Sequence, residues 1–244
     1  MLINFKFYMN LDNLSNNGFT IVKNALPEYQ KYLDIIINND YEIHQEAIWN
    51  LRLQMKKYFI EIFNDNNLAC SFDTYRMGDS PDLEWHIDEN QSHPDNLHCV
   101  QGILILKDSN VTHLLNKSHL YFKELSERIS DKNNNTWEFY TIPENDKIWS
   151  LGLNISTPDL KAGDLLLFDS RLVHRASFCN ERAVIFISMM PQKYISNCIK
   201  RKRKKGFLNG EQTTHWCDRY ILVDINGPKR VKIPDKYKEL ISDI

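Results

Sequence analysis

Residues 162–189 read AGDLLLFDSRLVHRASFCNERAVIFISM, and this stretch indicates the kind of fold. A Gly-Asp turn signal precedes the apolar run Leu165–Asp169, which has the length and composition of a buried strand. Two more strand-like runs follow at once, Leu172–Ser177 and Arg182–Met189. Short strands separated by polar turns are typical of a β-sandwich or barrel.

The same texture extends back to about Cys70, whereas the chain before it has helical patterns. The expected helices are Leu11–Asn16, Pro27–Asn38 and Glu42–Phe63, with a strand at Gly18–Lys23 between the first two. Further expected strands are Ser71–Met77, Glu84–Asp88, Leu97–Leu106, Val111–Leu115 and Ile148–Ile155. A helical start followed by many short strands predicts an α+β, mainly β chain with helices packed on the β core.

Composition excludes several classes of protein. The 244 residues hold 30 Lys+Arg and 32 Asp+Glu, so a net charge of −2 excludes a uniformly basic nucleic-acid coat and an acidic disordered protein. Five cysteines without a Cys-x-x-Cys pair argue against a disulfide framework and a thiolate zinc site. With no signal-peptide pattern and no apolar run of membrane length, we expect an intracellular, cytoplasmic protein.

The near-neutral average hides a charge asymmetry. Residues 200–238 hold 12 Lys+Arg against 4 Asp+Glu, and residues 1–199 hold 18 against 26. Six consecutive cations, Lys200–Lys205, have three interpretations: a phosphate-binding surface, a nuclear-import signal or a solvated helix face. We therefore divide the chain into a domain at 1–199 and a basic C-terminal extension at 200–244, packed on the same domain.

Three side chains are candidate metal ligands. In the expected strand at Glu84–Asp88, His86 and Asp88 point to the same face because side chains alternate along a strand. His174, near the end of an apolar strand, is the third candidate. Two histidines and one carboxylate on one face of an octahedron are typical of non-heme iron(II) oxygenases, although packed histidines are the alternative interpretation.

Arg182 is the candidate for binding an anionic cofactor. It lies eight residues after His174, across a turn-like segment centred on Phe178. A hairpin there would make His174 and Arg182 direct cross-strand partners with Cβ atoms about 5 Å apart. A forked guanidinium beside a metal ligand suits a carboxylate that is bound bidentately.

Five segments occur in a set order along the chain: Asn16–Leu26, Trp85–Asp88, Asn116–His119, Ala162–His174 and Asn180–Arg182. Taken together, and over roughly residues 11–190, they resemble the iron(II)- and 2-oxoglutarate-dependent dioxygenases, in particular the phytanoyl-CoA dioxygenase-like branch. The resemblance implies a double-stranded β-helix (jelly-roll, cupin-like) core.

The resemblance also implies the cofactors and the reaction. Iron(II) would be held by His86, Asp88 and His174, and the co-substrate 2-oxoglutarate by Arg182, with Gln101 as a further candidate contact. Succinate and CO2 would be the co-products. Because family members that halogenate have a small residue where this chain has Asp88, we expect hydroxylation of an unactivated C–H bond.

Two other functions remain open from the sequence. One is oxidative demethylation of nucleic acid, which the basic segment suggests. It is not favoured, because the demethylating branch of the family usually has a second arginine after the first on the final strand, and none follows Arg182 on its strand. The other is a catalytically silent jelly-roll module that binds a polyanion through residues 200–238. The expected partner is a small-molecule or conjugated substrate, with an anionic one as an option, while the substrate itself and the oligomeric state are not readable. Nuclear localisation through Lys200–Lys205 is the alternative to the cytoplasm.

Overall fold

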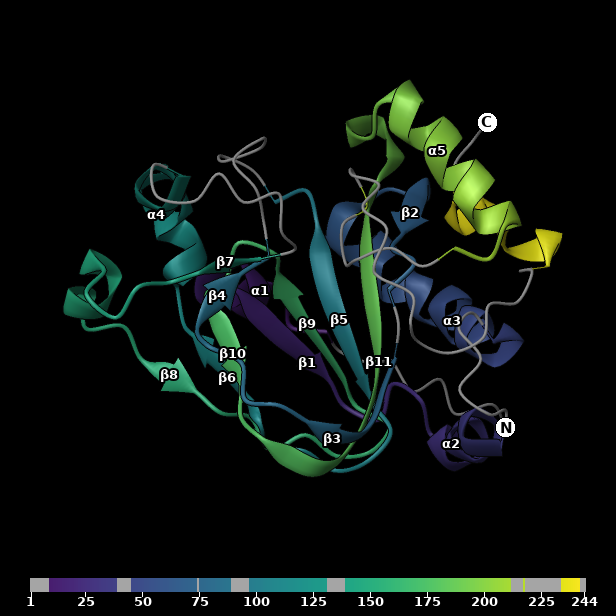
Figure 1. Ribbon diagram of the computed structural model, residues 1–244, viewed down its shortest axis with the longest axis horizontal. Helices are drawn as coiled ribbons and strands as arrows, with labels where there is room; N and C mark the ends of the chain where they lie inside the picture. Colours follow the sequence, from purple (N-terminus) through teal and green to yellow (C-terminus); the bar gives the residue numbers. More distant parts are fainter. Residues whose placement is uncertain are drawn as a thin grey trace.

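The computed structural model describes residues 9–38, 45–73, 75–88, 97–130, 139–211, 217 and 234–241. Its core is two antiparallel sheets (Figure 1). The six-stranded sheet has the order β1-β9-β5-β11-β2, with β3 also paired to β11, and the five-stranded sheet has the order β7-β4-β10-β6-β8. Neighbours in each sheet are distant in sequence, as in a jelly roll, which confirms the predicted fold class.

The strands are short apart from β11. Those of the six-stranded sheet are β1 (Phe19–Val22), β2 (Leu68–Cys70), β3 (Tyr75–Ser80), β5 (Val100–Ile105), β9 (Leu165–Asp169) and β11 (Cys179–Pro191). Those of the five-stranded sheet are β4 (His86–Ile87), β6 (Thr112–Leu115), β7 (Tyr140–Thr141), β8 (Ile155–Ser156) and β10 (His174–Ala176).

Three of the helices precede the second strand, as the sequence predicted. The helices are α1 (Leu11–Asn17), α2 (Tyr29–Asn38), α3 (Glu46–Phe63), α4 (Phe122–Ser130) and α5 (Asn197–Leu208). Four 3-10 helices accompany them: η1 (Ser118–Tyr121), η2 (Lys147–Leu151), η3 (Gln192–Tyr194) and η4 (Asp235–Leu240). Among the described residues, none of these helices is both long and apolar enough to cross a membrane.

The strand predicted at Ile148–Ile155 is wrong. Its first part is the 3-10 helix η2, because the Asp146 side chain accepts a hydrogen bond from the backbone N–H of Ile148 at 2.8 Å and caps a helical turn. The indole N–H of Trp149 then donates to the carbonyl of Pro143 at 2.8 Å, which closes the turn. A local cap therefore outweighed the apolar composition of this run.

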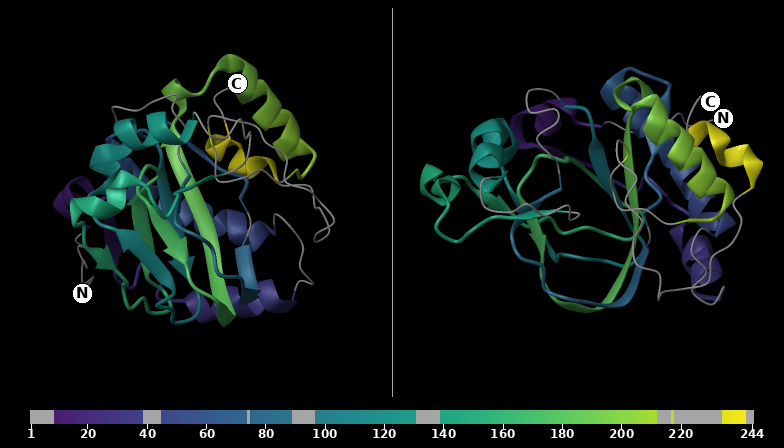
Figure 2. Two further views of the ribbon diagram at one scale, coloured as in Figure 1. Left: turned by 60° about the vertical axis from the view of Figure 1, so that its left-hand side comes forward. Right: turned by 45° about the horizontal axis from the view of Figure 1, so that its top comes forward.

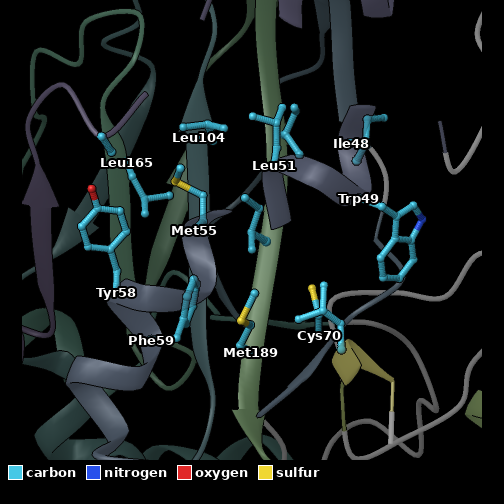
Figure 3. Packing of buried hydrophobic residues seen from close by; sticks show 14 of the residues in the cluster. Ile48, Trp49, Leu51, Met55, Tyr58, Phe59, Cys70, Leu104, Leu165 and Met189 are labelled. Atoms are coloured by element: carbon cyan, nitrogen blue, oxygen red, sulfur yellow. The ribbon is translucent and has the colours of Figure 1, made fainter. Parts of the chain in front are cut away.

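Helix α3 packs on the outer face of the six-stranded sheet (Figure 3). It buries the residues that recur at helical spacing, Ile48, Leu51, Met55 and Phe59, against strand residues such as Leu104, Leu165 and Met189. The helix comes close at Gly102, where an added Cβ would lie 3.2 Å from the Phe59 ring and 2.8 Å from the carbonyl oxygen of Ile187. Only glycine allows this approach.

The opposite face of the same strands looks toward the five-stranded sheet. Because side chains alternate, Val184 of β11, Ile103 of β5 and Leu166 of β9 leave the α3 side and form a second buried cluster. Leu114 of β6 belongs to this cluster and joins it to the five-stranded sheet. The space between the sheets is therefore a packed interior, and polar side chains in it need a specific reason.

The described C-terminal parts pack on the α3 side of the molecule (Figure 2). Phe207 of α5 and Tyr237 of η4 are buried in the same cluster as α3, and Tyr237 donates a hydrogen bond to the Asn50 side chain at 2.7 Å. We keep the division into a domain at 1–199 and an extension at 200–244 as a proposal, with helix α5 running across that boundary.

Candidate metal centre

The three predicted metal ligands come together. His86 of β4 and His174 of β10 are direct cross-strand partners in the five-stranded sheet, and Asp88 follows β4 directly. One potential ligand atom from each of the three lies within 4.8 Å of the others, and all three residues are buried. Strand pairing therefore brings together residues that are almost ninety positions apart.

Each histidine is oriented by a backbone carbonyl. The Nδ1 atom of His86 lies 2.6 Å from the carbonyl oxygen of Glu84, and Nδ1 of His174 lies 2.9 Å from that of Leu172. A carbonyl oxygen only accepts, so each Nδ1 donates its proton there, and Nε2 is the ring nitrogen left for a metal ion. This is the arrangement that prepares imidazoles as metal ligands.

The Nε2 atoms face the carboxylate. Nε2 of His174 lies 3.1 Å from one oxygen of Asp88, and Nε2 of His86 lies 3.8 Å from the other. Burial opposes a positive charge on His174, but the charge and hydrogen bond of Asp88 outweigh burial and raise the pKa of His174. The three groups thus place two nitrogen donors and one carboxylate oxygen close together.

Aromatic rings enclose this centre on two sides. The Phe168 ring lies 4.8 Å from the His174 ring, and the Phe139 ring lies 4.9 Å from the His86 ring, both between centroids. Phe168 is buried, whereas 41% of Phe139 is exposed. One side of the centre is therefore sealed by the core, and the other carries an apolar side chain open to solvent.

The predicted pairing of His174 with Arg182 is wrong. His174 pairs with His86 and Leu114 in the five-stranded sheet, whereas Arg182 pairs with Gly78 of β3 in the other sheet. The chain crosses between the sheets after β10, and the ladder between β11 and β3 shifts register between Cys179 and Arg182. The two side chains are neighbours across the interior and not along a hairpin.

Arg182 nevertheless points into the space between the sheets. It shares a face of β11 with Val184 and Phe186, and its guanidinium carbon lies 5.8 Å from the Phe186 ring centroid. Only 5% of the residue is exposed, and burial, followed by the nearby charge of Arg76, lowers the pKa of Arg182 to about 10. Its positive charge acts on His174, whose pKa it lowers against the larger effect of Asp88.

The hydrogen bonding of Arg182 is incomplete within the described part of the chain. Its Nη1 donates to the Ser80 hydroxyl at 3.3 Å, and its buried Nε has no acceptor there. Ser80, at the end of β3, was not among the sequence candidates, because nothing local marks it and only the pairing of β3 with β11 brings it to Arg182. A buried guanidinium with free donors is suited to an incoming carboxylate.

Gln101 also lies on the interior side. It pairs with Phe168 on one neighbouring strand and with Ser188 on the other, and only 8% of it is exposed. Its buried side-chain Nε2 has no hydrogen-bond acceptor among the described residues. Its partner Phe168 contacts the His174 ring, so Gln101 lies on the strand next to one that contacts a candidate metal ligand.

The basic run Lys200–Lys205 lies on α5, on the far side of the six-stranded sheet from this centre. Arg203 is fully buried, donates to the carbonyls of Cys70 and Ile241, and lies with its guanidinium carbon 4.8 Å from the Phe72 ring. Arg201, Lys202 and Lys205 are exposed. One cation of the six is thus a packing residue. The described residues do not decide among the three interpretations of the others.

Comparison with known proteins gives one curated relative of note. No protein-family model matches the chain. Ava biosynthesis cluster protein O of Aspergillus versicolor is 26% identical over 204 residues, and the match covers 73% of this chain. The chain spans only 65% of the length of that relative.

Solved structures of similar fold include three proteins. The epimerase SnoN, in complex with Fe3+, alpha ketoglutarate and nogalamycin RO, has a TM-score of 0.53 and 14% identity over 74% of this chain and 82% of its own. EctD from S. alaskensis, with 2-oxoglutarate and 5-hydroxyectoine, has a TM-score of 0.52 and 14% identity over 79% of each chain. HygX from Streptomyces hygroscopicus, with iron bound, has a TM-score of 0.50 and 14% identity over 92% of this chain and 95% of its own. At these identities the similarity shows a shared fold.

Proposed function

We propose that this chain is an iron(II)- and 2-oxoglutarate-dependent oxygenase that hydroxylates an unactivated C–H bond of a small molecule or conjugate. The observation that carries the proposal is the convergence of ligand atoms of three buried residues, His86, Asp88 and His174, within 4.8 Å of one another. That SnoN, EctD and HygX, which share the fold, are solved with iron or 2-oxoglutarate supports it.

The donor set fits iron(II). Two imidazole nitrogens and one carboxylate oxygen on one side of an ion are the facial arrangement of non-heme iron oxygenases, which leaves positions for other ligands. The carbonyls of Glu84 and Leu172 hold the two imidazoles in the tautomer that ligation needs. The Asp88 carboxylate is buried between the two imidazoles, with its oxygens 3.1 Å and 3.8 Å from their Nε2 atoms, and a buried carboxylate is stabilised by a bound cation.

The neighbouring side chains fit 2-oxoglutarate. We assign the carboxylate of this co-substrate that lies far from the metal to Arg182, whose Nε has no acceptor among the described residues. Ser80 holds the guanidinium from the β3 side, and Gln101 offers a further buried amide donor. An anionic ligand would supply a counter-charge, since no carboxylate of the described residues forms an ion pair with Arg182.

Bound iron with 2-oxoglutarate would supply the activation of O2, with succinate and CO2 as co-products. The residues of this chain would bind and orient the reactants and keep water away. Phe168 closes the inner side of the centre, and the exposed ring of Phe139 offers an apolar surface beside His86. That surface suits a substrate whose reacting carbon carries no polar group, which supports hydroxylation of an unactivated position.

The experiment is a comparison of two histidine variants under anaerobic conditions. Purified protein with iron(II) and 2-oxoglutarate should show a weak visible charge-transfer band, which His174→Ala should abolish. His113→Ala is the matched control. His113 pairs with Arg175, the residue after His174, and its ring forms hydrogen bonds with the hydroxyls of Thr157 and Ser177 on the other face of the sheet.

A screen of metabolite extracts for oxygen-dependent succinate formation would then find the substrate. We expect activity in wild type and His113→Ala and none in His174→Ala. Wild-type protein that gives neither the band nor succinate with any extract would contradict the proposed function.

A further inference from the structure

We propose that Gly18 and Ser118 are positioning residues for His174: they fix the backbone just before it and so set the direction of its metal-binding nitrogen. This inference rests on the ligand role of His174 in the proposed function. It concerns two residues that are not metal ligands in the proposed function and that lie far from His174 in the sequence.

The direction of the His174 ring depends on the residue two positions before it. The Nδ1–H group of His174 donates to the carbonyl oxygen of Leu172 at 2.9 Å, and this bond turns Nε2 toward Asp88. A displaced Leu172 carbonyl would rotate the imidazole and move Nε2 away from the other two donors. The position of the 172–173 backbone is therefore part of the geometry of the metal centre.

Ser118 holds this backbone from one side. Its hydroxyl oxygen accepts a hydrogen bond from the backbone N–H of Val173 at 2.8 Å, and both residues are fully buried. The carbonyl of Val173 in turn accepts from the N–H of Leu115 at 2.9 Å. The segment from β6 into η1 thus forms hydrogen bonds with both the N–H and the carbonyl of Val173.

Gly18, between α1 and β1, contacts the segment that leads to His174. It ends α1 in the left-handed conformation, with φ of 88°, and its carbonyl accepts from the N–H of Asp169 at 2.9 Å. An added Cβ would lie 2.4 Å from the Leu172 side chain and 2.7 Å from Nδ1 of His119. The α1–β1 junction is therefore in contact with the tip of the Leu172 side chain, which a Cβ at position 18 would displace.

His119 connects the segment of Ser118 with the segment of Gly18. It follows Ser118 on η1, and its Nε2 donates to the carbonyl of Ser15 in α1 at 3.1 Å. Its ring packs beneath Gly18, since its Nδ1 is among the atoms closest to that glycine. The three segments around positions 18, 118 and 172 thus contact one another next to His174. Each of them belongs to a motif on which the family resemblance rests.

Two variants with matched controls test the inference. Ser118→Ala removes the acceptor for Val173, and Ser126→Ala is its control, because Ser126 is buried on the next helix and donates a hydrogen bond at 2.9 Å to the carbonyl of Lys123 within that helix. Gly18→Ala drives a methyl group into Leu172. Gly152→Ala is the control, because Gly152 has φ of 65° but no atom within 4 Å of an added Cβ.

The measurement is cobalt(II) titration of the metal-free proteins, followed by absorbance of the d–d bands, at a temperature where circular dichroism shows every variant folded. We expect Ser118→Ala to bind about 10-fold more weakly than wild type with altered band positions, as changes behind a metal ligand do, and Gly18→Ala to bind more weakly still. Both controls should match wild type in affinity and spectrum.

A purely structural role would lower only the unfolding temperature. If Ser118→Ala binds cobalt(II) with wild-type affinity and spectrum, the inference is wrong, whether or not Gly18→Ala folds. If wild-type protein itself binds no metal, or His174→Ala binds as well as wild type, the proposed metal centre fails instead. The two failures are therefore distinguishable.

Discussion

Replacing Arg182 by methionine should have opposite effects on stability and on cofactor binding. Methionine fills a similar volume without charge. In the protein without ligand, Arg182 is a buried cation, only 5% exposed, with one hydrogen bond to Ser80 at 3.3 Å. Such a group costs folding free energy until an anion arrives.

The stability effect follows from the lowered pKa. The lowering of the Arg182 pKa to about 10 means that the folded chain disfavours the charged guanidinium, by about 3 kcal/mol at 1.36 kcal/mol per pKa unit. Arg182→Met removes this cost and also some packing, so we expect a net gain of about 1–2 kcal/mol. For a chain of this length that gain raises the melting temperature by about 2–8 °C.

The binding effect has the other sign. At 2-oxoglutarate concentrations of about 100 Kd, wild-type protein should gain about 2.7 kcal/mol, or roughly 5–10 °C. Loss of the guanidinium should weaken binding by about 3 kcal/mol, roughly 100-fold, so the same concentration should add only about 0.4 kcal/mol.

The assay is thermal unfolding with manganese(II), with and without 2-oxoglutarate. Arg175→Met is the control, because Arg175 lies beside His174 on β10 but its guanidinium lies over Trp85 and near Asp82, on the other face of the sheet. The control should keep the wild-type shift. An Arg182→Met protein that keeps the full shift with 2-oxoglutarate would refute the assignment of this arginine to the co-substrate.

Three further predictions concern the scaffold. Gly102→Ala should cost about 1–3 kcal/mol in urea unfolding, because its Cβ would lie 2.8 Å from the carbonyl oxygen of Ile187 in β11 and 3.2 Å from the Phe59 ring of α3; an unchanged midpoint would contradict the close packing around Gly102. Arg203→Met should cost about 2–3 kcal/mol through loss of hydrogen bonds to two buried carbonyls, whereas Lys202→Met on the exposed face should change stability by less than about 0.5 kcal/mol; equal effects would refute the packing role. Burial lowers the pKa of His119, so below about pH 6.5 the unfolded chain binds a proton that the folded chain does not; wild-type stability should therefore fall between pH 7 and pH 5 more steeply than that of His119→Gln, and parallel pH profiles would count against a buried neutral ring.

The parts of the site that depend on local spacing could be predicted from the sequence. His86 and Asp88 are two positions apart on a strand, so alternation alone places them on one face. The apolar stripe of α3 likewise identified the face that packs on the sheet. His174 was a candidate from its place near the end of an apolar strand, but no local pattern shows that β10 pairs with β4 and brings it to His86.

The parts that depend on how the chain passes between sheets could not be predicted. A hairpin was the simplest interpretation of the residues between His174 and Arg182, but a jelly roll sends consecutive strands to different sheets. Ser80 was missed for the same reason, since only the pairing of β3 with β11 brings it to Arg182. Ser118 lay in a segment noted for its resemblance, yet its hydrogen bond to Val173 is visible only in three dimensions.

The central claim is that one metal ion sits among His86, Asp88 and His174, and a crystal structure with iron(II) and 2-oxoglutarate grown without oxygen tests it most directly. Diffraction data collected at the iron absorption edge should show one strong anomalous peak bonded to Nε2 of both histidines and to an oxygen of Asp88. Density for 2-oxoglutarate should join that peak to the guanidinium of Arg182. An anomalous map with no peak at these three residues would contradict the claim, provided that the iron concentration is high enough to produce peaks at other metal-binding positions in the crystal.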